Sequence, residues 1–280
     1  MIYTDSNSNV TTAENSTETN TLAANADVLG PLVADIDTDG SEDIPYVPAG
    51  GTKVHLVNPD GTDETELSST DAKGSTSLLG VGRWNDTRTS VYFAGGDSST
   101  IYRTNPSEGE NPSEGDIQVV DPDNGVKAVA GPADIDGDGT NELVYADGSS
   151  ALRYFESGAG PGIATGEKIS VTAGSDSGIG LGRPADVDGD GTARIPAVDG
   201  SSNLVLVDSS GTKTVLVGSD VAKAPVAAVD WDDDGELEVM YITTNGDLKY
   251  VDDVTGSQTV EDTGISEPRK ETGVTPVRPG

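Results

Sequence analysis

The sequence predicts an all-β protein, a six-bladed β-propeller of four-stranded antiparallel blades whose sixth blade is closed by N- and C-terminal strands. Two observations lead to this fold class. Apolar residues come in short alternating runs, and no stretch keeps the 3.6-residue apolar period of a helix. A motif of three alternating aspartates followed by glycine occurs four times, and each copy precedes a similar series of short strands.

The aspartate motif marks a repeat of about 47 residues. The four copies, named loops A to D, read ADIDTDGSEDI at 34–44, ADIDGDGTNEL at 133–143, ADVDGDGTARI at 185–195 and VDWDDDGELEV at 229–239. A worn copy, LGVGRWNDTRTSVYFAGG at 79–96, fills the wide gap between loops A and B. It carries Arg83 where the others begin with aspartate.

Each repeat contains four short strand-like segments. An apolar segment leads into the aspartate loop, a second ends in glycine, a third follows at once, and a fourth is shorter and polar. In the third repeat the last three read LVYADG (143–148), ALRYFES (151–157) and KISVT (168–172). Four strands in a repeat of this length are typical of β-propeller blades.

Both ends of the chain are needed to complete the ring. TGVTPVRPG at 272–280 aligns with a first and second strand, whereas MIYTDSNSN at 1–9 and TNTLAAN at 19–25 match a third and fourth, around a polar loop over 11–20. Sharing the last blade pairs the edges that an open ring would expose. The alternative is five blades with two unpaired tails. We expect a single domain over 1–280, with repeats at 30–79, 80–129, 130–181, 182–223, 224–264, and 265–280 joined with 1–29.

The chain is strongly acidic, with 49 acidic residues, 16 basic residues and a formal net charge of −33. Self-repulsion of this size opposes compaction at low salt and is screened at molar salt. The composition resembles that of proteins from salt-loving archaea; an ordinary acidic secreted protein is the alternative. A surface this negative repels nucleic acid and anionic membranes, so neither is expected as a partner.

The sequence also bears on location. It has no cysteine, so disulfides do not brace the fold. It contains neither an apolar run long enough to cross a membrane nor a hydrophobic signal segment, and we expect no direct membrane insertion. We expect an extracellular, cell-surface or virion-surface protein, trimmed from a longer precursor, whose signal or anchor is not present in this chain.

The aspartate loops carry the ligands that calcium prefers. In loop B, Asp134, Asp136 and Asp138 supply oxygens at positions 1, 3 and 5, Gly139 allows a sharp turn at position 6, and Glu142 returns an acid at position 9. Ca²⁺ takes about six to eight oxygen ligands, and a backbone carbonyl at position 7 with water would complete the set. An EF-hand would need Glu at position 12 and flanking helices, which this sequence does not offer. The alternative without metal is a series of Asp-Gly hairpin turns.

These loops resemble the calcium loops of FG-GAP/VCBS repeats, which build the β-propeller of integrin α-subunits and of many secreted microbial proteins. The resemblance implies a structural Ca²⁺ site in each of the three loops that match the spacing in full. The matching residues are Asp35, Asp37, Asp39, Ser41 and Asp43 in loop A; Asp134, Asp136, Asp138, Thr140 and Glu142 in loop B; and Asp230, Asp232, Asp234, Glu236 and Glu238 in loop D.

Loop C departs from this pattern because Arg194 stands at position 9. A fixed cation beside the ion would weaken its binding, so we expect partial or no Ca²⁺ occupancy there. Arg83 in the second repeat and Lys270 in the sixth take position 1, where each is expected to replace a calcium with its own positive charge. The remaining candidate ligands of loop C are Asp186, Asp188, Asp190 and Thr192.

No catalytic constellation is visible in the sequence, where His55 is the single imidazole and the 16 basic residues do not cluster. We therefore expect no enzyme, but a calcium-stabilised extracellular binding or adhesion propeller of a halophilic organism or its virus. Its expected partner is protein or glycan on a cell or virion surface, recognised through rim loops. The alternatives are a polysaccharide-acting lyase or hydrolase, as some proteins with similar repeats are, and a structural subunit of a surface filament, layer or virion.

Two long inserts, 103–115 and 155–167, lengthen the second and third repeats and are candidate recognition segments or plain connections. Asn9, Asn15 and Asn85 begin N-x-[ST] triplets, which are glycosylation acceptors in secreted proteins. Neither the ligand nor the oligomeric state follows from the sequence, because loop chemistry rather than fold specifies them.

Overall fold

The computed structural model describes most of the repeats and parts of both chain ends. The described residues are 2–4, 10–15, 18–23, 26–29, 34–37, 39–62, 64–68, 71–72, 79–84, 89–96, 100–104, 119–120, 125–156, 162–163, 167–172, 180–232, 234–256, 258–266 and 274–275. Their regular elements are all β-strands, which confirms the predicted all-β class. A helix able to cross a bilayer does not occur among them.

The described strands form six sheets, numbered here by repeat. Sheet 1 has the order β4 (Ala26–Leu29), β5 (Ile44–Pro48), β6 (His55–Val57) and β7 (Thr65–Glu66). Sheet 2 has β8 (Leu79–Gly82), β9 (Ser90–Ala94), β10 (Thr100–Thr104), β11 (Val119–Val120) and β15 (Gly162–Ile163). Sheet 3 has β12 (Val126–Ala133), β13 (Glu142–Asp147), β14 (Ala151–Phe155) and β16 (Glu167–Thr172).

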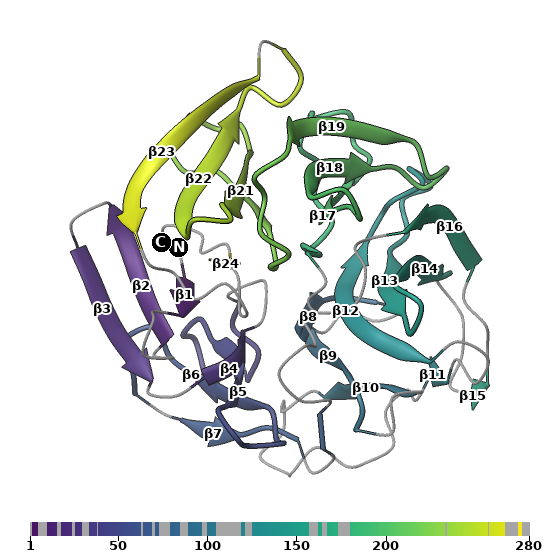
Figure 1. Cartoon of the computed structure of the whole chain (residues 1–280). Coiled ribbons are helices and arrows are strands. Elements are labelled where there is room, and N and C mark those ends of the chain that lie inside the picture. Colours follow the sequence, from purple (N-terminus) through teal and green to yellow (C-terminus); the bar gives the residue numbers. More distant parts are fainter. Residues whose placement is uncertain are drawn as a thin grey trace.

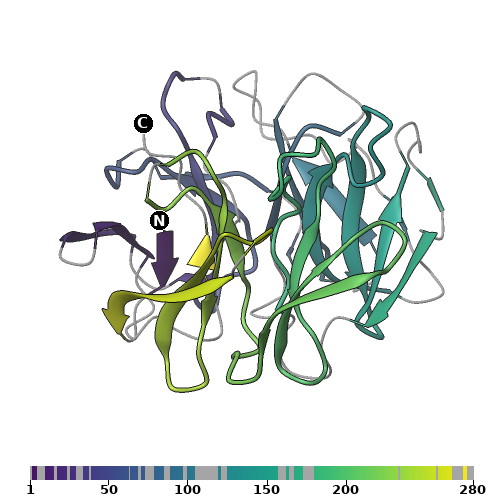
Figure 2. The same ribbon diagram turned by 90° about the horizontal axis from the view of Figure 1, so that it is seen from above.

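The remaining sheets complete a ring. Sheet 4 has β17 (Ile195–Val198), β18 (Asn203–Val207) and β19 (Lys213–Gly218). Sheet 5 has β20 (Ala227–Val229), β21 (Glu238–Ile242), β22 (Asp247–Asp252) and β23 (Thr259–Ser266). Sheet 6 has β24 (Val274–Thr275), β1 (Ile2–Thr4), β2 (Val10–Asn15) and β3 (Glu18–Ala23). Figure 1 shows the sheets following one another around a central axis, and Figure 2 shows the same molecule turned by 90° from that view.

The two ends of the chain share sheet 6, as the sequence predicts. β24 pairs antiparallel with β1, with Ile2 opposite Thr275 and Tyr3 opposite Val274. The division of strands differs from the expectation, since the C-terminus supplies one described strand and the N-terminus three. Residues 11–15 and 18–20 of the expected polar loop lie instead in the paired strands β2 and β3. Its threonines explain the difference, because β-branched residues favour strands even when they are polar.

Two sheets depart from the predicted four strands. Sheet 2 gains β15 from the third repeat, which pairs with β11 in parallel. In sheet 4 the inner segment is reduced to two isolated bridges, Leu181 with Ala197 and Ala185 with Arg194. A Cβ at Gly182 would lie 2.5 Å from the carbonyl oxygen of Val226, so this segment passes very close to sheet 5. Pro184 also lacks the amide donor that a longer ladder needs.

The apolar core lies between neighbouring sheets. One cluster joins sheets 3 and 4 and includes Val144, Leu152, Ile195 and Val205. Comparable clusters join sheets 1 and 2, sheets 2 and 3, and sheets 4 and 5. The strands β9, β13 and β21, which follow the repeat loops, are buried along their whole length. The loops are therefore anchored to the best-packed part of each sheet.

Trp84 tests this packing. It is 0% exposed, and its ring meets Tyr92 edge-on with centroids 6.4 Å apart. Trp84→Ala should lower the free energy of unfolding by about 3–5 kcal/mol, the usual cost of deleting a buried aromatic side chain. Denaturant titration at molar salt measures the change. As a control, Val215 is 49% exposed, and Val215→Ala should alter stability by less than about 0.5 kcal/mol. Equal losses in the two variants would contradict the assignment of Trp84 to the core.

Candidate metal-binding loops

Loops A to D turn sharply because glycine stands at position 6 of each. Gly40, Gly139, Gly191 and Gly235 have φ angles of 96°, 89°, 90° and 92°, in a region where a side chain would be strained. In every loop the amide of position 7 then donates to the aspartate at position 5, over 2.7 to 2.9 Å. The backbone thus folds back on itself and holds the alternate carboxylates on one side.

Each loop brings three carboxylates together. The oxygens of each set lie within 4.8 Å of one another, close enough for a single cation to contact all three. Donor sets made only of oxygen suit Ca²⁺. The sets are Asp35, Asp37 and Asp39 in loop A; Asp134, Asp136 and Glu142 in loop B; Asp186, Asp188 and Asp190 in loop C; and Asp230, Asp232 and Asp234 in loop D.

Some predicted ligands stand outside these sets. The carboxylate of Asp138 bonds within the loop: its Oδ1 accepts hydrogen bonds from the amide and the hydroxyl of Thr140 over 2.8 and 2.6 Å. Among the predicted acids, Asp43, Glu236 and Glu238 also do not belong to any of the sets. Position 7 is held by Ser41, Thr140 and Glu236 in loops A, B and D. The contribution of their backbone carbonyls stays a prediction.

The acid at position 9 lies beneath its loop, at the start of the second strand. Asp43, Glu142 and Glu238 are at most 1% exposed. Each accepts a hydrogen bond from the amide at position 2, which ties the beginning of the loop to the beginning of the strand. This bond runs from Ile36 to Asp43 over 2.7 Å, from Ile135 to Glu142 over 3.0 Å, and from Trp231 to Glu238.

Burial raises the pKa of these three acids, to about 6 for Asp43 and to about 7 for Glu142 and Glu238. Desolvation is the largest cause, and the charges of nearby aspartates add to it. The amide hydrogen bonds oppose the shift without cancelling it. The three acids therefore take up protons near neutral pH unless a positive charge lies nearby.

Loop B also holds an unsatisfied buried oxygen. Glu142 Oε2 accepts the Ile135 amide, whereas Oε1 is buried with no hydrogen-bond partner among the described residues. The same carboxylate belongs to the set with Asp134 and Asp136. A buried carboxylate oxygen without a donor is costly, and a cation bound by the set would satisfy it. The residues of loop B thus fit a divalent cation.

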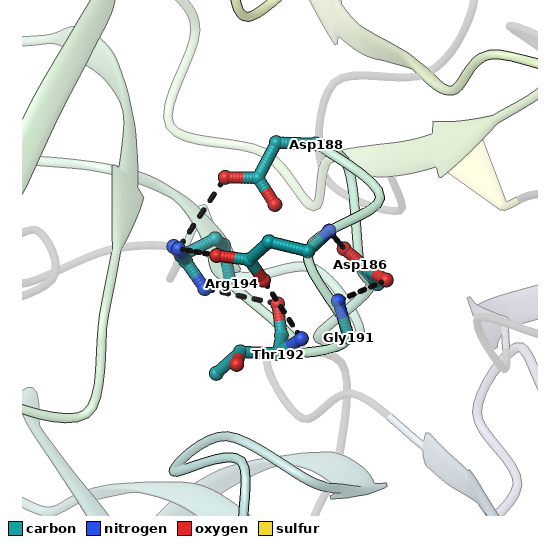
Figure 3. A network of polar contacts seen from close by, with 6 residues as sticks. Asp186, Asp188, Gly191, Thr192 and Arg194 are labelled. Atoms are coloured by element: carbon teal, nitrogen blue, oxygen red, sulfur yellow. Dashed lines mark hydrogen bonds and ion pairs between the residues drawn. The ribbon is translucent and has the colours of Figure 1, made fainter.

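In loop C the guanidinium of Arg194 lies among the carboxylates (Figure 3). Its Nη2 is 2.7 Å from Asp190 Oδ2 and 3.3 Å from Asp188 Oδ2, and Nη1 donates to the carbonyl oxygen of Thr192 over 2.9 Å. These partners are positions 5, 3 and 7, which are the positions expected to bind an ion. Asp186 accepts amide hydrogen bonds from the loop itself. The arginine neutralises the loop from within.

The remaining predicted positions are the cations at position 1, the asparagines of the N-x-[ST] triplets and the two long inserts. Lys270, Asn9, Asn85 and most of the two long inserts lie outside the described residues, while Asn15 ends β2. The carbonyl of Arg83 accepts a hydrogen bond from Asn141 in loop B over 2.8 Å, which links sheet 2 to loop B. Its proposed role as a substitute for calcium stays a prediction.

Sequence reasoning missed a pocket beside loop C, with a volume of about 330 Å³. It is lined by Leu206 of β18, Asp208 of the turn that follows and Thr214 of β19, by Val254 and Gln258 between β22 and β23, and by residues of loop C. These segments lie far apart in the sequence and meet only because the two sheets pack side by side. No local motif could have revealed the pocket.

Comparison with known proteins identifies the fold. No protein-family model and no curated protein matches the sequence. A triple mutant of AofleA from Arthrobotrys oligospora matches with a TM-score of 0.59 and 11% identity, over 89% of this chain and 77% of that one. The Aleuria aurantia lectin, a six-bladed β-propeller with a fucose recognition mode, matches with a TM-score of 0.52 and 17% identity, over 88% and 82%. These two likenesses show a β-propeller fold.

A third similar structure is longer than this chain. The biofilm matrix protein Bap1 of V. cholerae has a TM-score of 0.47 and 14% identity. The match covers 92% of this chain and 43% of Bap1, so this chain spans less than half of that protein.

The raised pKa values predict a pH dependence for the metal-free protein. The native state keeps protons on Asp43, Glu142 and Glu238 up to about pH 6 to 7, whereas the unfolded chain releases them near pH 4. The free energy of unfolding should therefore fall as the pH rises through this window. Thermal unfolding at molar salt with a chelator measures the slope.

Glu142→Gln should make this slope shallower, because a neutral amide does not titrate and only Asp43 and Glu238 then contribute. Glu66→Gln is the matched control: it removes the same charge from an exposed residue, and the slope should stay as in the parent chain. Identical slopes in the two variants would contradict the role of the buried acid.

Proposed function

We propose that this chain is a calcium-stabilised β-propeller with one blade per sheet, and that it serves outside the cell as a carbohydrate-binding module. The observation that carries the binding function is the likeness in fold to the Aleuria aurantia lectin, a propeller with a fucose recognition mode. A non-enzymatic role fits the same likeness. The strongly negative charge of −33 supports a halophilic source, because high salt screens its self-repulsion. A cell- or virion-surface setting is part of the same proposal.

Calcium has a structural role in this proposal. Loops A and D would hold it through their carboxylates at positions 1, 3 and 5, and loop B through Asp134, Asp136 and the buried Glu142. The carbonyl at position 7 would add a further oxygen in each loop. The unsatisfied Oε1 of Glu142 supports this assignment, as does the spacing shared with FG-GAP/VCBS repeats. The ion supplies positive charge when bound. The residues of the chain supply the frame, which links each loop to the first residue of a buried strand.

Loop C is assigned no ion. Arg194 contacts the acids at positions 3 and 5 and the carbonyl at position 7, so an ion at the same place would have to displace the guanidinium. Burial lowers the pKa of Arg194, but its hydrogen bond to Asp190 and the negative charges of nearby aspartates raise it by more. The side chain therefore stays charged. Three structural calcium ions per chain follow from this assignment.

Calcium titration by calorimetry tests the metal part. The chelated protein should bind about three Ca²⁺ at molar salt, and Asp136→Asn should remove about one of them because it takes a carboxylate from loop B. Asp60→Asn is the control. Asp60 stabilises an ordinary turn by accepting from the amide and hydroxyl of Thr62 over 2.9 and 2.6 Å, and its loss should leave the stoichiometry unchanged. Absence of calcium binding to the parent chain would contradict the proposal.

The converse variant should create a site. Arg194→Glu removes the internal cation and restores an acid at position 9 of loop C, so the stoichiometry should rise by about one. Lys53→Glu makes the same change in charge on the surface, beside Asp71, and should add no site. An unchanged stoichiometry in Arg194→Glu would contradict the substitution of arginine for calcium.

A glycan array probed at molar salt with calcium tests the binding function. We expect retention of a subset of glycans and no cleavage of the polysaccharides offered. Cleavage would overturn the proposal in favour of a lyase or hydrolase. Assembly into particles far larger than the 28.5 kDa chain, without glycan binding, would overturn it in favour of a structural subunit.

A further inference from the structure

The pocket beside loop C has no part in holding calcium, yet its residues are arranged as a ligand site. It lies where loop C, the end of β18, the start of β19 and the turn after β22 meet. Its volume of about 330 Å³ is at the lower end of the range for small-molecule sites, about 300–1,000 Å³. The pocket therefore suits a single small ring rather than an extended chain.

The lining combines apolar and polar surfaces. Val187, Leu206 and Val254 are 8%, 7% and 8% exposed and form the apolar part. Thr214 and Thr255 also line the pocket, are exposed and add hydroxyl groups. A sugar ring has the same two properties, because its C–H groups pack on apolar side chains while its hydroxyls need donors and acceptors. The surface therefore complements a polyhydroxylated ring better than a purely apolar molecule.

The polar groups are held in place before any ligand arrives. Arg194 is fixed by its contacts with loop C. Asp208 Oδ1 accepts from the Ser210 hydroxyl over 2.7 Å and from the Thr212 amide over 2.8 Å, which orients its carboxylate. The Gln258 side chain donates to a backbone carbonyl over 3.4 Å. Groups that are already oriented lose little entropy on binding.

The charges of the pocket point to a neutral ligand. Asp188 and Asp208 line it together with Arg194, the one cation among the described residues of the lining, in a chain with a net charge of −33. An anion would meet excess negative charge, and a metal ion would meet the guanidinium. Hydroxyls donate to carboxylates and accept from arginine, so one neutral molecule can use both kinds of group. We propose that this pocket binds one residue of a neutral saccharide, an assignment that rests on the proposed carbohydrate-binding function.

A steric block tests the site in the full chain at molar salt with calcium. The probes are methyl α-fucoside, methyl α-mannoside and methyl β-galactoside, with methyl β-glucuronide as the charged counterpart. Binding is followed by NMR chemical shifts of the backbone amides. At least one neutral probe should shift the resonances of 206–214 and 254–258, and the glucuronide should not.

Thr214→Trp should fill the pocket and weaken binding at least about tenfold, the equivalent of about 1.4 kcal/mol. Val215→Trp is the matched control: Val215 is the next residue on β19, is 49% exposed and does not line the pocket, so its variant should bind as the parent does. Gln258→Ala should also weaken binding, because Gln258 lines the pocket. This smaller change tests the site even if the tryptophan variant fails to fold.

The outcomes separate this site from the broader function. If the glycan array shows binding that Thr214→Trp and Gln258→Ala leave unchanged, the pocket assignment is overturned and the carbohydrate-binding function stands. If no neutral probe shifts the pocket resonances, or only the glucuronide does, the assignment to a neutral saccharide is overturned. An array without any retained glycan overturns both proposals.

Discussion

The structure depends on how its aspartate loops neutralise the negative charge that they concentrate. Each loop places three carboxylates with oxygens within 4.8 Å of one another, in a chain whose net charge is −33. Salt screens exposed charges but reaches buried ones poorly. Asp43, Glu142 and Glu238 are buried and also anchor the start of a strand. A positive charge in the loop therefore also affects how firmly the following strand is anchored. In loop C the guanidinium of Arg194 supplies this positive charge.

Ring closure is the second constraint, and it acts through contacts between sheets. Four of the five apolar clusters among the described residues draw on two neighbouring sheets, so a sheet without a neighbour would expose an apolar face. The pairing of β24 with β1 places the two chain ends in one sheet of the ring. Close packing of the inner strands limits side-chain size: a Cβ at Gly80 of β8 would lie 2.6 Å from the Cα of Gly131 in β12. Glycine is needed there for space.

Much of the fold could be predicted because its signals are local. β14 falls within the segment predicted at 151–157, and position-6 glycines such as Gly139 adopt the left-handed φ that the motif predicts. The division of sheet 6 was predicted wrongly, because polarity over 11–20 outweighed the strand preference of threonine. The parallel pairing of β15 and the pocket arise between segments distant in sequence. For Arg194 the sequence predicted interference with an ion, and only the folded loop reveals its contacts with positions 3, 5 and 7.

Because the aspartate loop occurs four times, loop C could lose its metal and contribute to a ligand pocket while the other loops kept the acidic pattern. An ion enclosed by carboxylates presents little of itself to a ligand in a neighbouring pocket. A guanidinium has five N–H donors, and the contacts with Asp188, Asp190 and Thr192 use three of them within the described part of the chain. The same side chain that neutralises loop C therefore also lines the adjoining pocket. Replacing an acid by arginine at position 9 both removes the need for a metal and places an oriented donor between two sheets, while loops A, B and D keep the acidic pattern.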